Sequence, residues 1–182
     1  MLVKLVLIAA LSLVSSTSGQ DWEKADRETK RLPPSAFASL PMAIRRDLER
    51  RGCTIPQPFT AQRPSNVISG RFTSPSRTDW AVLCSISRAS SILVFRGGSA
   101  LAAEEFARHS DSTFLQVVGS GDTVEYSRAI VTANAEYIRA HARGNVRMPR
   151  VTHDGINDLF VEKGSSVWYW SGGRWLELPG AD

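Results

Sequence analysis

The chain has 182 residues, of which 42% are hydrophobic and 22% are charged, a balance typical of a globular protein and not of a disordered one. Its formal net charge is +4, carried mostly by arginines that are scattered among 18 acidic residues. Because such scattering is typical of a solvated surface, we expect no nucleic-acid partner.

The N-terminal segment has the pattern of a secretory signal peptide. Lys4 supplies a positive charge, residues 5–14 are mostly apolar, and residues 15–19 are small. The apolar run is too short for a membrane-spanning helix. We therefore expect residues 1–19 to be removed on export. The mature protein would then be secreted or periplasmic, with no membrane span.

Two cysteines lie in the mature part of the chain, Cys53 and Cys84. An oxidising compartment and an even number of cysteines favour one disulfide between them. The sequence contains no Cys-X-X-Cys spacing, which would indicate a redox pair. The pattern predicts a structural bridge between Cys53 and Cys84.

The mature chain begins with a polar lead-in over residues 20–38. Within it, residues 21–31 are predicted to form a short charged helix, which Pro33 and Pro34 would end. The lead-in is too small to bury a core of its own. We expect residues 39–182 to form a single globular domain.

A second helix is predicted directly after the lead-in. Ser39 is a candidate N-cap, and a proline follows in the first turn. Leu40, Ile44 and Leu48 recur at a spacing of four and form one apolar stripe. Gly52 is the expected C-terminal cap, so Cys53 lies where a disulfide would join this helix to a sheet.

The rest of the chain is dominated by strand patterns. The predicted strands are residues 66–72, 79–86, 90–95, 114–118, 124–131, 155–161, 166–170 and 174–178. Residues 100–109 and 133–143 have helical composition. Short turns such as residues 171–173 separate consecutive strands, which favours antiparallel pairing. The predicted fold class is α+β, a mainly antiparallel sheet with an N-terminal helix joined to it by the disulfide.

Two segments share a spacing, beginning at Arg71 and at Arg150. Each has an arginine, a threonine two residues later, an aspartate eight residues later (Asp79 and Asp158), and then an apolar strand. These segments resemble the loops of FG-GAP or VCBS-type repeats, whose pattern is D-x-N-x-D-G-x-x-D. The resemblance implies blades of a β-propeller, with loop oxygens that bind calcium.

The ligand positions of that repeat can be carried over to each segment. In the first, only Asp79 keeps a carboxylate, so we expect a metal-free loop in which Asp79 bonds backbone N–H groups. In the second, Thr152, Asp154 and Asp158 are the candidate metal ligands. Because calcium takes about 6–8 oxygen ligands, these three would be only part of a site. The alternative is a structural turn without calcium.

A wider pattern is similar to a family of uncharacterised exported bacterial proteins. The residues that carry it are 51–57, 79–84, 153–156 and 162–182. The resemblance spans most of the mature chain. It implies a single envelope domain and no particular activity.

One group of side chains could support acid–base chemistry. His153, Asp154 and Asp158 lie close together in the sequence, and a hydrolase could be centred on them. The alternative is that these residues only shape a turn. No motif of a nucleophilic hydrolase or of a phosphate-binding loop accompanies them.

A cluster of aromatic residues lies near the C-terminus. In a strand, Trp168 and Trp170 share one face while Tyr169 points to the other, and Trp175 returns across the predicted hairpin. These three tryptophans could form an exposed platform for a glycan or a peptide. Alternatively, they form core and cross-strand contacts.

Taken together, the patterns favour a non-enzymatic envelope domain that binds an envelope protein or a glycan. Two alternatives stay open, the hydrolase centred on His153, Asp154 and Asp158, and a purely structural blade-like module. They differ in what the fold must show. A hydrolase needs His153 in a cleft with a second polar group, whereas a binding module needs an exposed aromatic or apolar surface.

Overall fold

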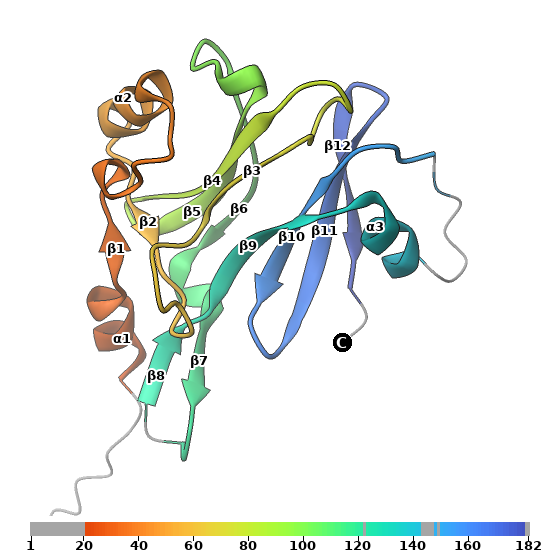
Figure 1. Ribbon diagram of the computed structural model, residues 1–182. Coiled ribbons are helices and arrows are strands. Elements are labelled where there is room, and N and C mark those ends of the chain that lie inside the picture. The colour runs from red at the N-terminus through yellow and green to blue at the C-terminus, as the bar shows by residue number, and fades with distance from the viewer. Residues whose placement is uncertain (1–20, 122, 143–147, 149, 181–182) are drawn as a thin grey trace, which may run out of the picture.

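A computed structural model describes residues 21–121, 123–142, 148 and 150–180, so the predicted signal peptide lies outside the described residues. The described chain forms two four-stranded antiparallel sheets, β3-β4-β5-β6 (the first sheet) and β9-β10-β11-β12 (the second sheet). Two short strand pairs, β1-β2 and β7-β8, and the helices complete the fold (Figure 1). The predicted α+β class, with antiparallel pairing throughout, is confirmed.

The elements follow one another with short connections. In chain order they are α1 (Trp22–Glu28), β1 (Arg31–Leu32), the 3-10 helix η1 (Pro34–Ala36), α2 (Met42–Arg50), β2 (Ile55–Pro56), β3 (Val67–Gly70), β4 (Asp79–Ile86), β5 (Ala89–Phe95), η2 (Arg96–Gly98), β6 (Ala103–Ser110), η3 (Asp111–Phe114), β7 (Leu115–Val118), β8 (Thr123–Tyr126), β9 (Arg128–Ala133), α3 (Ala135–His141), β10 (Gly155–Phe160), β11 (Gly164–Ser171) and β12 (Arg174–Pro179). None of the described helices is long and apolar enough to span a membrane.

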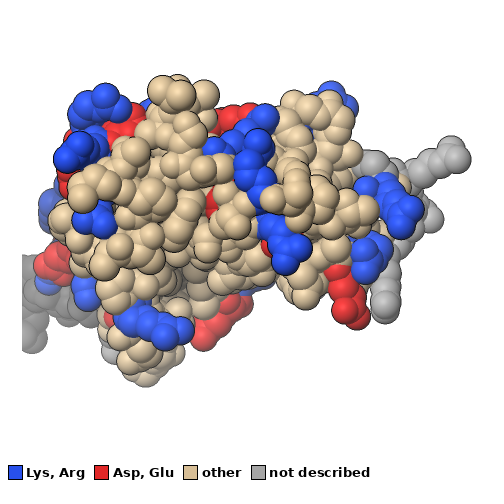
Figure 2. All heavy atoms as spheres, turned by 45° about the horizontal axis from the view of Figure 1, so that its top comes forward, with Lys and Arg blue, Asp and Glu red and all other residues tan. Residues whose placement is uncertain are grey.

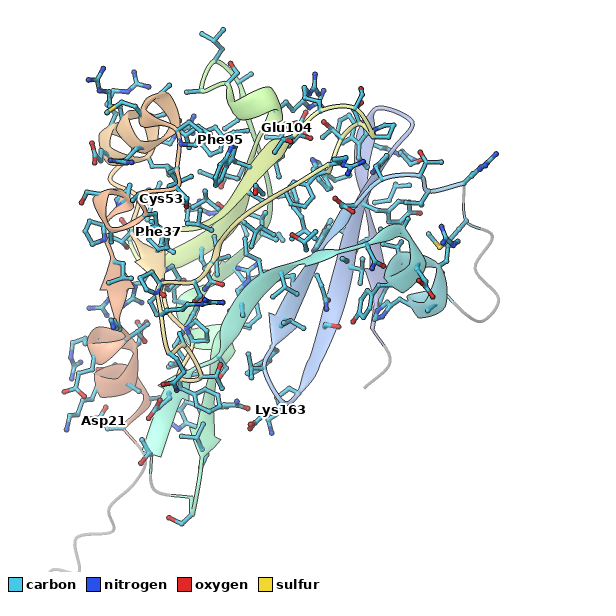
Figure 3. All side chains as sticks on the ribbon, viewed as in Figure 1. Asp21, Phe37, Cys53, Phe95, Glu104 and Lys163 are labelled. Carbon is cyan, nitrogen blue, oxygen red and sulfur yellow. A yellow bond between two sulfur atoms is a disulfide. The ribbon has the colours of Figure 1, made fainter. Side chains whose placement is uncertain are left out.

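The helix α2 covers the outer face of the first sheet. Its predicted stripe of Leu40, Ile44 and Leu48 is fully buried, and it packs against alternate residues of β4 and β5. Cys53 follows the helix and forms a disulfide with Cys84 of β4, which confirms the predicted bridge. Figure 3 shows Phe37, Cys53 and Phe95 in the space between this helical layer and the sheet. The N-terminal part of the chain is thereby fastened to the first sheet.

The two sheets face each other across a second apolar layer. Alternation along the strands turns Ala81, Leu83, Ile92 and Val94 of the first sheet inward, opposite Ile130 and Ile156 of the second. A third cluster lies on the far side of the second sheet, where α3 buries Ile138 (Figure 1). The order of layers is therefore helices, first sheet, second sheet and helix α3.

The structure corrects the prediction of a helix over residues 100–109. Most of these residues belong to the edge strand β6, which pairs with β5 from Phe95↔Ala103 to Ala89↔Ser110. The alanine and glutamate content favours a helix locally, but the open edge of β5 offers a ladder of backbone hydrogen bonds. Tertiary pairing therefore overrides a weak local propensity.

Two further expectations need correction. The predicted strand over residues 124–131 is two strands, because β8 and β9 belong to different sheets and meet at the fully buried Ser127. Helix α2 begins at Met42 after Pro41, without a side-chain cap, so Ser39 is not its N-cap. The expected C-terminal signal is confirmed, since Gly52 has the positive φ (68°) that glycine tolerates.

Candidate functional site

A candidate site is a groove at the end of the space between the two sheets. The floor of the groove lies on the second sheet and consists of rows of residues that pair across neighbouring strands. In one row, Asp158 lies opposite Ser166, and Ser166 lies opposite Pro179. In the next row, Trp168 lies beside Glu177. The groove has a volume of about 400 Å³, within the range of small-ligand sites.

The opposite wall comes from a distant part of the chain. It consists of His109 at the end of β6 and Phe114 of η3, whose rings meet edge to face at 5.8 Å. The described residues that line the groove are His109, Phe114, Asp158, Phe160, Lys163, Gly164, Ser165, Ser166, Trp168, Glu177, Pro179 and Gly180. The groove thus combines aromatic rings, hydroxyl groups, and both acidic and basic side chains.

Several polar side chains of the groove are free to bind a ligand. Within the described part of the chain, the side chains of His109, Lys163, Ser166 and Glu177 make no hydrogen bond or ion pair. His109, Lys163 and Glu177 are also exposed to solvent. Their donors and acceptors are therefore satisfied by water in the free protein and are available to a ligand.

Asp158, in contrast, is held by a buried arginine. Arg128 is fully buried and donates from Nε (2.9 Å) and Nη2 (2.8 Å) to the two carboxylate oxygens. It also donates to the carbonyl and hydroxyl oxygens of Ser90 (2.9 and 3.0 Å) and lies over the ring of Phe114 at 4.5 Å. This buried ion pair lies at the base of the groove, where it engages both oxygens of the Asp158 carboxylate.

The remaining partner of Arg128 comes from an irregularity in β6. The register with β5 shifts between Ser90 and Ile92, and Ala107 has a φ of 52°. This bulge directs the carbonyl oxygen of Ala107 toward Nη2 of Arg128, at 2.7 Å. A positive φ at a residue with a Cβ is strained, so the hydrogen bond to Arg128 compensates for it.

The same network continues to Tyr126. Its hydroxyl lies 3.5 Å from that of Ser90. Burial raises the pKa of Tyr126 far above its usual value, while the contact with Ser90 and the nearby charge of Arg128 lower it only in part. This phenol is therefore neutral throughout the physiological range.

The three predicted tryptophans lie on the inward face of the second sheet, and all are half-buried. Trp168 packs against Phe106 of β6 (5.0 Å between ring centroids), and Phe106 stacks on Trp175 at 4.6 Å. Trp170 and Trp175 are directly opposite across the hairpin, with their rings edge to face at 5.7 Å. Trp168 alone of the three lines the groove.

Two charged residues tie Trp170 and Trp175 into the interface between the sheets. Arg96 lies 4.0 Å above the ring of Trp170 and forms an ion pair with Glu104. Glu104 in turn accepts a hydrogen bond from the indole nitrogen of Trp175 (2.8 Å). As predicted from strand alternation, Tyr169 points the other way and is buried with Leu178.

The structure separates the three residues that were candidates for hydrolysis. The Nδ1 atom of His153 contacts the carbonyl oxygen of Asp154 at 3.0 Å, and a carboxylate oxygen of Asp154 accepts the backbone N–H of Arg71 at 2.9 Å. Asp158 is bound by Arg128 at the groove. Among the described residues, no hydrogen bond joins any two of the three side chains.

The candidate metal ligands Thr152, Asp154 and Asp158 are also divided among different surroundings. Thr152 lines a separate cleft, Asp154 accepts the N–H of Arg71, and Asp158 is neutralised by Arg128. Within the described ranges, no three residues of the His, Cys, Asp or Glu type gather around a common point. Calcium binding stays a prediction, which needs ligands from outside this set.

The two loops that resemble repeat loops meet in space. The backbone N–H of Asp154 donates to the carbonyl oxygen of Arg71 (3.0 Å), and the backbone N–H of Arg71 donates in turn to the carboxylate of Asp154. Asp79 accepts the backbone N–H groups of Thr73 and Gly97, both at 2.8 Å. The predicted role of Asp79 in fixing its loop is thus confirmed.

Sequence reasoning missed His109 and Arg128. His109 lay in the predicted helix, so nothing placed it beside Asp158. The burial of Arg128 could have been predicted from the sequence. It is two residues from Ile130 in an apolar strand, so both side chains lie on the same, inward face of that strand. A buried arginine needs an acid, and Asp158 is that partner.

Comparisons of the chain with protein-family models, with curated protein sequences and with solved structures found no match. The function must therefore be argued from the geometry described above.

Proposed function

We propose that this protein is an exported binding module whose groove takes a glycan chain. The observation that carries the proposal is the position of Trp168. Its ring lies in the groove beside Ser166 and Glu177, whose side chains make no hydrogen bond or ion pair within the described part of the chain. Sugars combine apolar C–H faces with a rim of hydroxyls, so a ring flanked by donors and acceptors matches their chemistry.

The groove offers hydrogen bonds of both kinds. Glu177 accepts from sugar hydroxyls, Lys163 donates to them, and Ser166 does both. Ser166 of β11 and Glu177 of β12 lie on adjacent strands, which are about 4.8 Å apart, and Lys163 directly precedes β11. The buried pair of Arg128 and Asp158 holds this floor rigid, which lowers the entropic cost of binding.

Binding is better supported than hydrolysis. A general acid or base must be able to exchange its proton with a substrate, and Asp158 is engaged on both oxygens by Arg128. His153 and Asp154 lie outside the groove lining. The groove thus has recognition groups, while the proposed catalytic trio shares no reactive centre.

The proposal is tested by co-sedimentation of residues 20–182 with three insoluble glycans, namely peptidoglycan sacculi, chitin and cellulose. We expect retention on at least one of them. On that glycan, Glu177→Gln and Lys163→Gln should each weaken binding about fivefold or more, since each loses a charge-assisted hydrogen bond. Matched controls are Glu136→Gln on α3 and Lys24→Gln on α1, both exposed and remote from the groove.

Retention on none of the three glycans would count against the proposal. So would equal retention of the groove variants and the controls. A substitution of Trp168 is a less clean test, because its ring also packs against Phe106 and Trp168→Ala can destabilise the fold. Thermal melting of each variant separates lost binding from lost folding.

The blade-like module is the second candidate, and one observation favours it. Both sheets are four-stranded antiparallel meanders in sequence order, and Asn66 joins their first strands by bonding to Arg128 and Ile130. Two packed meanders of this kind resemble neighbouring blades. A purely structural role leaves the groove without a ligand, so the glycan experiment also decides between the two candidates.

A further inference from the structure

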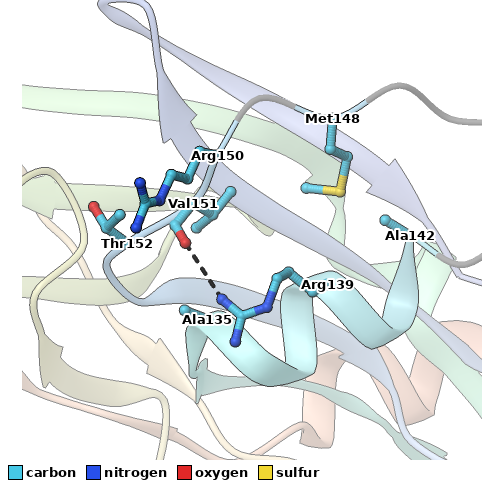
Figure 4. Close-up of a pocket in the computed structure, with 7 residues that line it drawn as sticks. All are labelled: Ala135, Arg139, Ala142, Met148, Arg150, Val151 and Thr152. Atoms are coloured by element: carbon cyan, nitrogen blue, oxygen red, sulfur yellow. Dashed lines mark hydrogen bonds between the residues drawn. The ribbon is translucent and has the colours of Figure 1, made fainter.

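A second cleft lies on the opposite side of the second sheet, between α3 and the segment that leads into β10. The described residues that line it are Ala135, Arg139, Ala142, Met148, Arg150, Val151 and Thr152, and its volume is about 540 Å³. Figure 4 shows the cleft, with the hydrogen bond from Arg139 Nη1 to the carbonyl oxygen of Val151 at 3.4 Å. Among the described residues, none lines both this cleft and the proposed glycan groove.

The positive charge of this cleft is not balanced by acids. In the described structure, neither Arg139 nor Arg150 has a carboxylate within 4.0 Å. The stretch of sequence that supplies both arginines contains no aspartate or glutamate between Glu136 and Asp154. Figure 2 shows one face of the molecule, on which basic and acidic side chains are interspersed. An uncompensated pair of guanidinium groups at a cleft attracts an anion.

The cleft has a polar end and an apolar end. In Figure 4, the guanidinium groups of Arg139 and Arg150 lie at one end with Thr152, while Met148 and Ala142 lie at the other. Val151 is buried, and Met148 and Ala142 pack against the same apolar cluster. Methionine adapts its shape readily, which suits a site for a flexible hydrocarbon chain.

We propose that this cleft binds an amphiphilic anion, a carboxylate or phosphate carried on an acyl chain. The two guanidinium groups and the hydroxyl of Thr152 hold the anionic head, and the apolar end receives the first methylene groups of the chain. The volume falls within the range of about 300–1,000 Å³ that small-ligand sites occupy. The same arginines repel a cation from Thr152, which disfavours calcium there.

The test is calorimetric titration of residues 20–182 with dodecanoate and with dodecyl phosphate, each below its micelle concentration. Dodecyl maltoside serves as a neutral ligand with the same chain, and inorganic phosphate as an anion without one. We expect saturable binding of at least one anionic amphiphile, about tenfold or more tighter than either comparison ligand. Whichever of dodecanoate and dodecyl phosphate binds more tightly identifies the preferred head group as carboxylate or phosphate.

Variants of the cleft then locate the site. Arg139→Gln and Arg150→Gln should each weaken the binding about tenfold, and Arg150→Lys less, because lysine keeps the charge and loses the planar fork. Arg46→Gln and Arg174→Gln are matched controls on exposed arginines outside the cleft. Equal binding of the neutral ligand, equal binding of inorganic phosphate, or equal loss in the controls would each overturn the proposal.

Discussion

The buried ion pair at the base of the groove allows a quantitative prediction. Asp158→Ala leaves the guanidinium group of Arg128 fully buried, with Nε deprived of its carboxylate partner. Arg128 retains only the neutral oxygens of Ser90 and Ala107. Leaving a buried charge without its partner costs about 3–5 kcal/mol, so we expect this loss in the free energy of unfolding.

A double-mutant cycle checks the reasoning. Arg128→Met removes the charge together with its donors, and the double variant Arg128→Met with Asp158→Ala removes both charged partners of the interaction. We expect the free energy of unfolding of the double variant to fall by about 2 kcal/mol or more less than the summed losses of the two single variants. Urea denaturation of the mature chain measures each free energy.

The exposed pair of Glu105 and Arg108 supplies the matched control. Its side chains are 43% and 56% exposed, so Glu105→Ala should cost less than about 1 kcal/mol. The argument fails if Asp158→Ala costs no more than this control. It also fails if the losses of the two single variants at Asp158 and Arg128 simply add.

Three further measurements follow from the structure. Loss of the disulfide in the double variant Cys53→Ser, Cys84→Ser should lower the free energy of unfolding by about 3–4 kcal/mol in urea, because the bridge closes a long loop (a separation of 31 residues). Groove binding should be unchanged, because both cysteines pack beneath α2 and neither lines the groove. Leu48→Ala should cost about 2–5 kcal/mol in the same assay, since Leu48 is fully buried under the first sheet; a loss below 1 kcal/mol would contradict its place in the core. Because burial raises the pKa of Tyr126, its contribution to stability is complete below the unfolded value of about pH 10 and is lost as pH rises further. Between pH 8 and 12, the melting temperature should therefore fall more steeply with pH for the wild type than for Tyr126→Phe. An equal dependence on pH in the two proteins would refute this.

The accuracy of sequence-based prediction differed sharply between the helix that covers the first sheet and the edge strand of that sheet. In the helix, the stripe of Leu40, Ile44 and Leu48 carried its own periodicity and was buried as expected. The edge strand β6 was predicted as a helix, because its alanines and glutamates favour a helix locally. Only the unpaired edge of β5 explains the strand, and that edge exists only after the sheet has formed.

The sequence by itself determined the features whose signal is local: the apolar stripe of α2 and its glycine cap, the C-terminal hairpin, and the pair of cysteines that bridges Cys53 and Cys84. Only the tertiary structure decided which polar residues meet. Asp158 was placed with its sequence neighbours His153 and Asp154, yet its partner Arg128 is 30 residues away, and His109 faces it from another sheet. The physical reason is that strand register and sheet packing set these contacts, and neither is encoded within a few residues of the site.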